Sequence, residues 1–515
     1  MLARTHAITH YGAQPHRITI ETDIFAGLPG ISLVGLPTKS VEESRERLRS
    51  AIRNSGLEFP MRKIVLNLAP ADTAKHGTGF ELAMAVGILI ASKQVSPQPE
   101  DILFSAELSL DGSLRPARDS AASVISAQQV ACKTLVIACD APPIPDSIKT
   151  QVTVVRIKNL RELYRWLIDE APRPNHPEPM QNVDKKTSLV DFSTIKGLEV
   201  PKRALEIAAA GGHNVLLIGP PGSGKTLLAH AFPTILPKLD TDELAEVAYL
   251  HGIHNPSAQH LQSRPIRSPH HTASDVALVG GGQIPKPGEV TLAHRGVLFL
   301  DELPEFRRSV LEALRQPIED GEVHISRAQT ALTYPAKFTL IAAMNPCPCG
   351  YAGSAKQACT CSVATINRYQ ARISGPLLDR FDMHCFITEP SITSPFEATS
   401  KAMPSSAILK RVELARDIQT SRFKMHGITA NSEIPSQELT TFCNASSDAQ
   451  KLLENALRNQ HISQRGAARA LKISRTIADL EKSPKIDTTH LSEALQFRSG
   501  LARKSSTQTA SFLAE

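Results

Sequence analysis

The feature that most constrains the fold of this chain is a glycine-rich segment near its middle. Residues 219–226 (GPPGSGKT) match the complete phosphate-binding loop pattern. A largely apolar run at 214–218 precedes the loop and another at 227–232 follows it, which predicts a strand, a loop and a helix in that order. In such a loop the glycines turn backbone N–H groups inward, and the helix N-terminus adds partial positive charge. The pattern therefore predicts an α/β fold with a phosphate site, and a simple glycine-rich turn is a poor alternative.

The type of loop also predicts its ligands, which are ATP and Mg²⁺. Lys225 is expected to reach the β- and γ-phosphates, and the Thr226 hydroxyl is expected to bind Mg²⁺. The residues that we expect to contact the nucleotide are Gly219, Pro220, Pro221, Gly222, Ser223, Gly224, Lys225 and Thr226.

Two further predicted strands end in the groups that ATP hydrolysis needs. Residues 296–302 (GVLFLDE) predict a buried strand that ends in two carboxylates. Asp301 is expected to hold Mg²⁺, directly or through water, and Glu302 to orient and polarise the attacking water. Residues 337–345 predict another strand, and its terminal Asn345 is expected to position that water. An asparagine that only ends a strand in a turn is the alternative for Asn345.

Composition excludes several other classes of protein. Apolar residues make up 41% and charged residues 21% of the 515 residues, which supports a folded core and argues against global disorder. No apolar run reaches the ~18 residues of a membrane helix, and the first residues do not resemble a secretory signal. The eight cysteines do not form a disulfide-like pattern. We therefore expect a cytoplasmic protein without a membrane partner.

Proline spacing and hydrophobic patterns predict the domain organisation. Four prolines within eight residues favour a linker at 170–190, which separates an α/β domain at 1–169 from a second α/β domain at 191–390. Residues 391–503 have helical patterns, and 504–515 form a polar tail. The first domain is expected to contain strands at 17–23, 63–68, 134–138 and 152–155, a surface helix at 39–54 and a buried helix at 80–92.

The net charge of +6 is confined to the last fifth of the chain. Residues 401–515 carry 17 Lys and Arg against 11 Asp and Glu, so the rest of the chain is neutral. A basic excess of this kind is compatible with a polyanion partner, but charge alone favours a solvated basic helical surface.

These motifs, in this order, resemble the AAA+ ATPases and, more narrowly, the magnesium-chelatase-like family. The resemblance covers nearly the whole chain. It rests on segments 27–37 (GLPGISLVGLP), 43–47 (ESRER), 67–72 (NLAPAD), 288–296 (GEVTLAHRG), 301–306 (DELPEF), 343–347 (AMNPC) and 374–382 (SGPLLDRFD). It implies an AAA+ core with a parallel sheet, a C-terminal helical lid and assembly into a homo-oligomeric ring, which we expect to be a hexamer.

The resemblance assigns roles to two arginines. Arg380 is similar to the arginine finger that reaches the γ-phosphate held by the neighbouring subunit, where a cation stabilises the transition state. Arg465 resembles the second sensor arginine of the lid, although Arg469 and Arg475 lie close to it in the sequence.

The resemblance also implies that the first domain has the Lon-protease-domain fold, which is ribosomal S5 domain 2-like. Proteases of that fold use a Ser–Lys dyad, but alignment places Gly79 at the nucleophile position and Ala121 at the lysine position. The domain is therefore not expected to be a peptidase. Thr78 lies one residue from the nucleophile position and is interpreted as a turn residue.

Four of the eight cysteines, Cys347, Cys349, Cys359 and Cys361, fall within 15 residues. Four thiolates in a short polar loop predict a tetrahedral structural Zn²⁺ site. Four reduced thiols or a redox-sensitive pair are the alternatives.

The family resemblance further implies two hairpins that project into a ring pore, for which 280–288 and 320–328 have the right positions. Lys286 and Arg327 are the candidates for phosphate contacts, with ordinary surface charge as the alternative. The expected function is ATP-driven translocation on single-stranded or branched DNA, with branch migration or unwinding during recombination of incoming DNA. The alternatives are a chelatase-type motor that remodels a protein partner without DNA and an ATP-switched interaction module.

Overall fold

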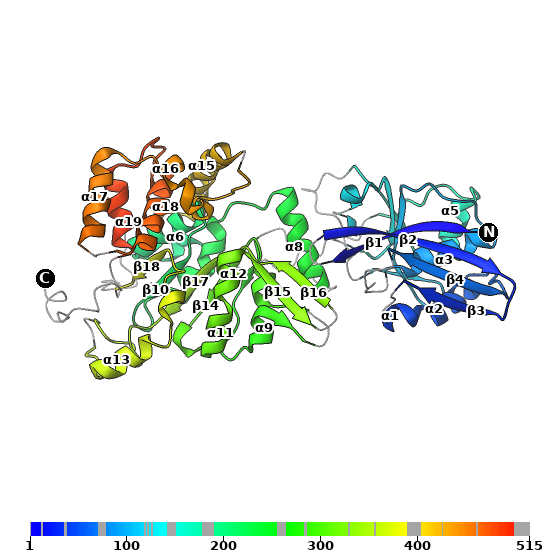
Figure 1. Cartoon of the computed structure of the whole chain (residues 1–515), viewed down its shortest axis with the longest axis horizontal. Coiled ribbons are helices and arrows are strands. Elements are labelled where there is room, and N and C mark those ends of the chain that lie inside the picture. The colour runs from blue at the N-terminus through cyan, green and yellow to red at the C-terminus, as the bar shows by residue number, and fades with distance from the viewer. Residues whose placement is uncertain are drawn as a thin grey trace. The chain divides into compact units, whose positions relative to one another are not determined.

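The computed structural model describes residues 2–11, 14–35, 39–70, 79–117, 120, 123–124, 127–141, 151–177, 190–254, 264–282, 286–327, 330–354, 357–388, 403–424, 426–459 and 462–498. Its contacts divide the chain into two units (Figure 1). The first unit comprises residues 1–185 with 239–262 and 324–334, and the second comprises the remainder.

A seven-stranded mixed sheet forms the centre of the first unit. Its strand order is β3 (Gly30–Val34), β4 (Lys63–Ala69), β2 (Gln14–Phe25), β1 (Ala3–Tyr11), β5 (Ile102–Ser105), β8 (Thr134–Ala138) and β9 (Thr153–Ile157). Helix α3 (Glu81–Ala91) packs against β1 and β2, and every one of its residues is buried. This confirms the buried helix that its nearly continuous apolar sequence predicts.

The remaining elements of the first unit are short. They are α1 (Lys39–Glu42), α2 (Ser44–Asn54), β6 (Glu107–Leu108), β7 (Leu114–Arg115), η1 (Ala127–Val130), α5 (Leu160–Leu167) and α8 (Thr241–His254). The surface helix predicted at 39–54 is present but is broken at Glu43. The four predicted strands of this domain are confirmed, whereas β1, β3 and β5 were not predicted.

The second unit is built on a five-stranded parallel sheet, which confirms the predicted parallel core. The order is β11 (Ile266–Arg267), β14 (Val297–Leu300), β17 (Thr339–Met344), β10 (Val215–Ile218) and β18 (Met383–Phe386), and each neighbouring pair is parallel. Strands β10 and β14 are buried throughout, because helices cover both faces of such a sheet. All five strands therefore point their carboxyl ends at one edge.

Short helices and two hairpins connect these strands. The helices are η2 (Phe192–Thr194), α6 (Glu199–Gly211), α7 (Lys225–Ala231), η3 (Phe232–Ile235), α9 (Asp275–Val279), α10 (Glu289–Leu292), η4 (Leu303–Glu305), α11 (Arg308–Ala313), α12 (Arg315–Asp320), α13 (Val363–Gln370) and α14 (Gly375–Leu378). One hairpin pairs β12 (Gly280–Gly281) with β13 (Lys286–Pro287). The other pairs β15 (Glu322–Arg327) with β16 (Thr330–Pro335), and its residues 324–334 group with the first unit. Both predicted hairpin segments thus contain strands.

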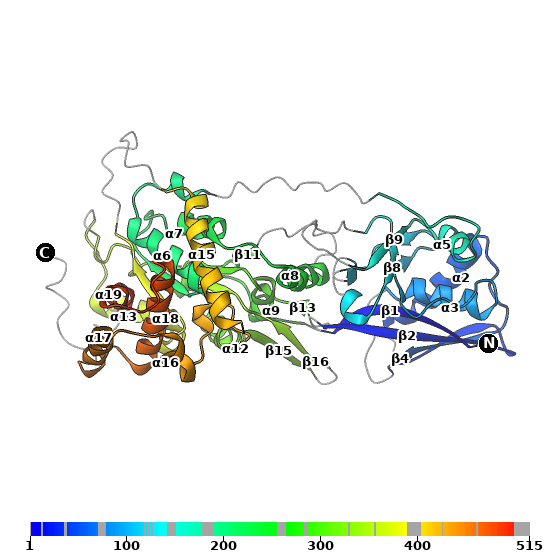
Figure 2. The ribbon, with the colours of Figure 1, turned by 90° about the horizontal axis from the view of Figure 1, so that it is seen from above.

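The described residues between 403 and 498 form helices, as predicted. The elements are α15 (Ser405–Phe423), η5 (Asn431–Glu433), η6 (Ser436–Glu438), α16 (Leu439–Phe442), α17 (Ser447–Arg458), α18 (Gln464–Leu480) and α19 (Thr488–Gln496). Helices α15 and α18 lie alongside α6 of the core (Figure 2). None of the helices in the described parts of the chain is long and apolar enough to span a membrane.

A buried ion network holds the C-terminal helices together. Asp479 of α18 is 1% exposed, and its carboxylate accepts hydrogen bonds from Arg422 (2.9 Å), Asn431 (2.8 Å) and Arg475 (3.1 Å). Arg475 is itself 1% exposed. The single carboxylate therefore pairs with two guanidinium groups in a site that water reaches poorly.

We predict that Asp479→Ala strongly destabilises the C-terminal helices. Removing the carboxylate leaves buried arginine charge uncompensated, which costs about 3–5 kcal/mol. Differential scanning calorimetry should show a lower unfolding temperature for this part of the protein. Asp448→Ala is the matched control, because Asp448 forms a fully solvated pair with Lys451. Equal unfolding temperatures for the two variants would contradict the assigned importance of the buried network.

Candidate nucleotide-binding site

The phosphate-binding loop connects β10 to α7 at the carboxyl edge of the parallel sheet. β10 ends at Ile218 and α7 begins at Lys225. Gly222 and Gly224 have φ angles of 75° and 88°, a left-handed backbone that side chains disfavour. The glycines thus permit the tight turn that the sequence predicts.

Lys225 lies at the centre of the site and is 8% exposed. Its Nζ donates to the carbonyl oxygens of Gly219 and Pro220, both at 2.8 Å, and to Oδ1 of Asn345 at 3.2 Å. Burial lowers the pKa of the ammonium, while the nearby Asp301 carboxylate opposes that shift. The Lys225 amine therefore bonds both to the phosphate-binding loop and to Asn345, which the sequence places at the end of another strand.

Thr226 and Asp301 form the other half of the site. The Thr226 hydroxyl donates to Oδ2 of Asp301 at 2.8 Å, and Oδ1 of Asp301 accepts the N–H of Glu302 at 2.9 Å. A hydroxyl and a carboxylate are the oxygen ligands that Mg²⁺ prefers, so this pair is suited to hold the ion. The structure places together Lys225, Thr226, Asp301 and Asn345, four residues whose proximity the sequence predicted.

Glu302 follows Asp301 and faces a histidine that the sequence analysis missed. Glu302 is 57% exposed in its side chain and adopts a φ angle of 53°, an uncommon backbone for a residue other than glycine. Its Oε2 lies 3.5 Å from Nδ1 of His271, whose ring is stacked on His270 at 4.1 Å between centroids. These histidines follow β11, so they lie at the same sheet edge as the other site residues. The paired histidines after a short strand were the available signal.

Arg380 follows α14 and makes its contacts on its own chain. Its guanidinium pairs with Glu319 of α12 and donates to the Pro376 carbonyl at 2.9 Å. The side chain is 11% exposed, and its Nε is buried without a hydrogen-bond partner. These contacts hold Arg380 beside α12.

Asp382, two residues after Arg380, connects this segment to both the sheet and the C-terminal helices. Its Oδ2 accepts the N–H of Asn214 at 3.0 Å, and its Oδ1 lies 3.6 Å from Nε of Arg469. Burial acts to raise the pKa of Asp382, but His213, Arg469 and the Asn214 N–H lower it to about 2.

The three C-terminal arginines differ in their surroundings. Arg475 is buried against Asp479 and donates to the Ser483 and Pro484 carbonyls, so it is not available to a phosphate. Arg469 donates to the Phe381 carbonyl at 3.1 Å in addition to its pairing with Asp382. Arg465 is exposed near the start of α18. The structure therefore leaves Arg465 and Arg469 as candidates for the second sensor.

The four clustered cysteines converge on one point. Their sulfur atoms all lie within 4.8 Å of one another, and the Cys347–Cys349, Cys349–Cys359 and Cys347–Cys359 separations are 3.3, 3.5 and 3.6 Å. None of the eight cysteines forms a disulfide. Backbone N–H groups of Tyr351 and Thr360 lower the pKa of Cys349 to about 5, which favours its thiolate. The cluster can hold a metal ion.

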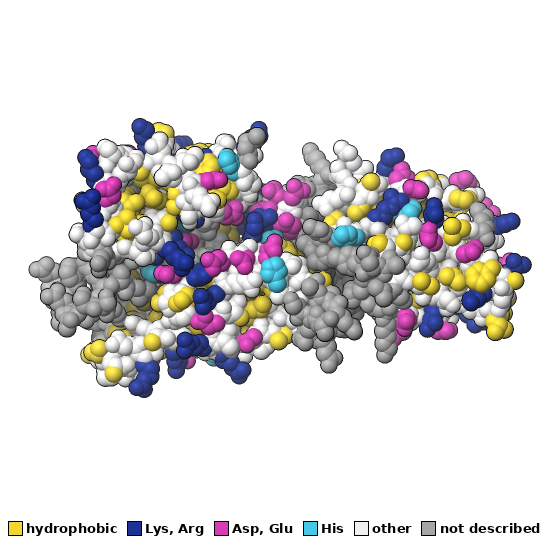
Figure 3. Space-filling model, viewed as in Figure 1, with side chains coloured by type: hydrophobic (Ala, Val, Ile, Leu, Met, Phe, Trp, Pro, Cys, Tyr) yellow, Lys and Arg dark blue, Asp and Glu magenta, His cyan; other side chains and the backbone are white. Residues whose placement is uncertain are grey.

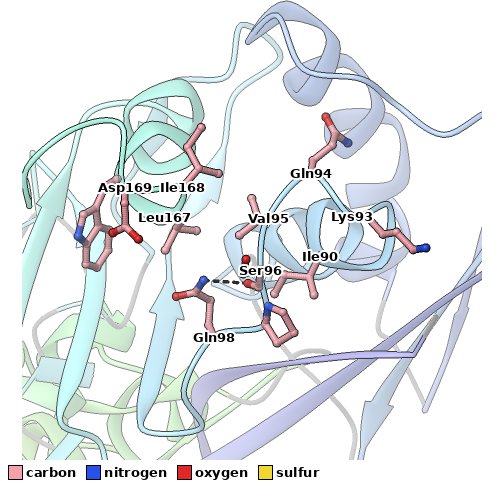
Figure 4. A pocket seen from close by; sticks show the side chains of 11 residues that line it. Ile90, Lys93, Gln94, Val95, Ser96, Gln98, Leu167, Ile168 and Asp169 are labelled. Atoms are coloured by element: carbon pink, nitrogen blue, oxygen red, sulfur yellow. Dashed lines mark hydrogen bonds between the residues drawn. The ribbon is translucent and has the colours of Figure 1, made fainter.

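Other predicted contact residues are less well defined. Lys286 is exposed on β13, where Gly281 is its backbone partner. The side chain of Arg327 lies outside the described residues, as do Thr78 and Ala121, whereas Gly79 lies just before α3. The first unit has an open pocket of about 590 Å³, which includes Lys93 and Asp169 in its lining (Figure 4). That lining contains no cluster of titratable groups, so the phosphate-binding loop remains the candidate site.

Comparisons with known proteins match all three parts of the chain to one family. The family models for magnesium chelatase subunit ChlI match residues 20–141 and 191–394, and the model for the C-terminal part of that subunit matches residues 402–498.

Individual relatives extend the match to nearly the full length. The chain is 42% identical to YifB of Salmonella typhimurium, over 96% of the chain and 97% of that protein. It is 40% identical to competence protein ComM of Haemophilus influenzae, again over 96% and 97%. The magnesium-chelatase 38 kDa subunit of Rhodobacter capsulatus is 27% identical, over 33% of the chain and 54% of that subunit.

We predict that two substitutions separate nucleotide binding from hydrolysis. Lys225→Ala should weaken ATP binding about 10- to 100-fold, because a charge-assisted contact with phosphate is lost. Glu302→Gln should bind ATP normally but hydrolyse it about 10²- to 10⁴-fold more slowly, because the water loses its polarising carboxylate. A fluorescent ATP analogue and phosphate release measure the two effects.

The control for this pair is Glu312→Gln, which removes a carboxylate of α11 that pairs with Arg315. This variant should bind and hydrolyse ATP as the wild type does. Wild-type hydrolysis by Glu302→Gln would show that another group activates the water.

Proposed function

The chain belongs to the magnesium-chelatase-like family of AAA+ proteins, with YifB and ComM among its full-length relatives, and we propose that it is a ring-forming ATPase that translocates DNA. The observation that supports the ATPase most directly is the convergence of Lys225, Thr226, Asp301 and Asn345 at one sheet edge. Lys225 supplies a cation for the phosphates, Thr226 and Asp301 supply two magnesium ligands, and Asn345 supplies an amide that positions water.

In the proposed reaction each residue acts on a different part of the Mg–ATP substrate. Lys225 and the loop N–H groups bind the β- and γ-phosphates, while Thr226 and Asp301 hold Mg²⁺, which neutralises phosphate charge. Glu302 accepts a proton from the attacking water, and Asn345 orients that water toward the γ-phosphate. His271, 3.5 Å from Glu302, is placed to restrain the carboxylate until the site closes.

We propose that hydrolysis requires a second subunit, because Arg380 acts in trans. An arginine finger must break its contacts within its own chain before it can reach the phosphate bound by a neighbouring subunit. Arg380 is here paired with Glu319, a partner that is 62% exposed and therefore easily solvated after release. Docking of the next subunit in a ring, which we propose to be a hexamer, would exchange Glu319 for a γ-phosphate. The exchange links turnover to assembly.

The remaining domains fit supporting roles in this proposal. The C-terminal helices would form the AAA+ lid, with Arg465 as second sensor and Arg469 as the alternative. The first unit would be a Lon-like α/β domain without peptidase activity, because Gly79 stands where the nucleophile is required. The free cysteines agree with the cytoplasmic location that we propose.

DNA is the proposed partner because of the family and the two hairpins. ComM is named as a competence protein, which connects that relative with uptake of DNA. Hairpin β12–β13 carries Lys286, and hairpin β15–β16 contains Arg327. We propose that both hairpins reach the pore of the ring. Basic and acidic side chains are interspersed on the face shown in Figure 3, so that face does not define a DNA track. The substrate would be single-stranded or branched DNA, with branch migration as the outcome.

A motor that remodels a protein partner without DNA is the second candidate. It is favoured by the match to a magnesium-chelatase 38 kDa subunit, which is named as part of a larger enzyme. That match covers only 33% of the chain, whereas the match to ComM covers 96%. The DNA motor is therefore the preferred proposal.

We further propose that the cysteine cluster binds a structural Zn²⁺. Four sulfurs at about 2.3 Å from one zinc ion stand about 3.8 Å apart. The sulfurs of Cys347, Cys349 and Cys359 lie 3.3–3.6 Å apart, and all four lie within 4.8 Å of one another. The ion would join two ends of a loop that has few apolar side chains of its own to pack.

We predict that DNA accelerates ATP hydrolysis and that salt suppresses the effect. Phosphate contacts release counterions, so DNA affinity should fall by about 10²-fold or more between 50 and 200 mM salt. The stimulation of ATP hydrolysis by DNA should therefore fall steeply over the same range. Lys286→Ala should reduce the slope of log DNA affinity against log salt concentration by about the value for one phosphate contact. Lys451→Ala on α17 should leave that slope unchanged. The assay is ATP hydrolysis with single-stranded and branched DNA. Stimulation by a partner protein and not by DNA would favour the second candidate.

We predict that Arg380→Ala binds ATP but hydrolyses it about 10³-fold more slowly, because transition-state charge is no longer stabilised in trans. Mixing Arg380→Ala with Lys225→Ala chains should restore some turnover, since each variant supplies what the other lacks. Arg458→Ala, which removes an exposed arginine of α17, is the control. Failure of every mixture to recover activity, with assembly intact, would exclude the trans arrangement.

A further inference from the structure

The cysteine cluster lies in the segment that joins two parts of the nucleotide site. β17 ends at Met344, Asn345 follows, and the first cysteine, Cys347, comes two residues later. The last cysteine is followed at once by Ser362, the N-cap of α13. A metal held by the four sulfurs would therefore close the loop between the strand of Asn345 and the start of α13.

One residue of this loop lies directly against the phosphate-binding loop. Gly350 has a φ of 89°, and a Cβ at this position would lie 2.5 Å from Cδ and 2.6 Å from Cγ of Pro221. Separations this short are steric overlaps, so only glycine allows the close approach. The Gly350 N–H donates to the carbonyl oxygen of Cys347 at 3.0 Å. The contact with Pro221 is therefore fixed by the fold of the cysteine cluster.

Residues at the C-terminal end of α13 contact the chain just after β17 and just after β14, the strands that precede Asn345 and Asp301. Gln370 donates from Nε2 to the Pro346 carbonyl at 2.9 Å, next to Asn345. Arg372 donates to the Pro304 carbonyl at 3.2 Å and to Glu305 at 3.0 Å, in the turn after Glu302. The helix that follows the cysteines thus contacts the chain beside the amide and beside the carboxylates.

From these contacts we propose that the cysteine cluster, with Zn²⁺ bound, positions the nucleotide site. The inference rests on the proposed zinc site and extends it from loop stability to control of ATP binding. Metal bonds would hold Gly350 against Pro221 and keep Asn345 beside Lys225. Without them, hydrogen bonds alone would restrain residues 347–361, and the restored freedom of this loop would loosen the phosphate-binding loop.

The first test removes the metal from full-length, untagged protein. Chelator-stripped wild type and Cys361→Ser should lose zinc and bind a fluorescent ATP analogue about tenfold more weakly, and adding Zn²⁺ should restore only the wild type. Cys139→Ser is the control, since Cys139 is a free cysteine outside the cluster. Elemental analysis gives the zinc content of each preparation. Unchanged ATP affinity after zinc loss would overturn the proposal.

The second test breaks the contact and leaves all four ligands in place. Gly350→Ala should keep its zinc but bind the ATP analogue about tenfold more weakly, because the new methyl group displaces Pro221. Pro221→Ala removes the Cγ and Cδ atoms that the methyl meets. The double variant should therefore recover most of the affinity that Gly350→Ala loses, because the steric overlap is gone and only the strain of an alanine at a positive φ remains. This rescue is not expected if Gly350→Ala acts only through global instability.

The outcomes distinguish this inference from the proposals it builds on. A zinc-loaded Gly350→Ala with wild-type ATP affinity would overturn the positioning role while leaving the zinc site and the ATPase intact. Absence of zinc from every preparation would refute the zinc site and, with it, metal control of the nucleotide site. Circular dichroism monitors folding, and if Gly350→Ala does not fold, the stripped wild type decides the question.

Discussion

The nucleotide site depends on the register between two neighbouring parallel strands, β10 and β17. Ile218 at the end of β10 pairs with Met344 at the end of β17. The residues that follow them, the phosphate-binding loop and Asn345, therefore leave the sheet side by side, and Lys225 lies 3.2 Å from Asn345. β14 pairs on the other side of β17 and brings Asp301 to Thr226. A slip of one residue in this register would separate the groups that we propose to act on one phosphate.

Much of this site was predictable because each motif carries its own local structure. The apolar runs before residues 219, 301 and 345 predict buried strands, and parallel strands share one carboxyl edge. The glycine-rich loop after the first strand and the carboxylate and amide residues after the other two therefore marked the site. The buried α3 was equally clear, since its sequence has almost no polar face. The sequence left Arg475 as a competitor for the second sensor, although Asp479, one helical turn later, marks it as one member of a structural ion pair.

The missed features depend on contacts between distant parts of the chain. The adjacent histidines were visible in the sequence, but β11 has only two residues, too few for a periodic signal, so their position opposite Glu302 did not follow from it. Arg380 and Glu319 are 61 residues apart in the sequence, and no sequence motif links them, so their ion pair could not be predicted. Gly350 looks like any loop glycine until Pro221 is placed against it. Such pairings follow from how helices and loops pack over the sheet, which local propensity does not specify.

The C-terminal helices are fixed to the core mainly through α6, and polar contacts make the attachment specific. Arg203 of α6 pairs with Glu493 at 2.9 Å, and Gln419 donates to the Ala210 carbonyl at 2.9 Å. These bonds favour one orientation of the helices more sharply than apolar packing alone would. Asp382 extends the attachment to the sheet, because one carboxylate meets Asn214 at the start of β10 and Arg469 of α18. Asp382 lies two residues after Arg380, so a rotation of α18 that displaced Asp382 would move Arg380 and the start of β10 together.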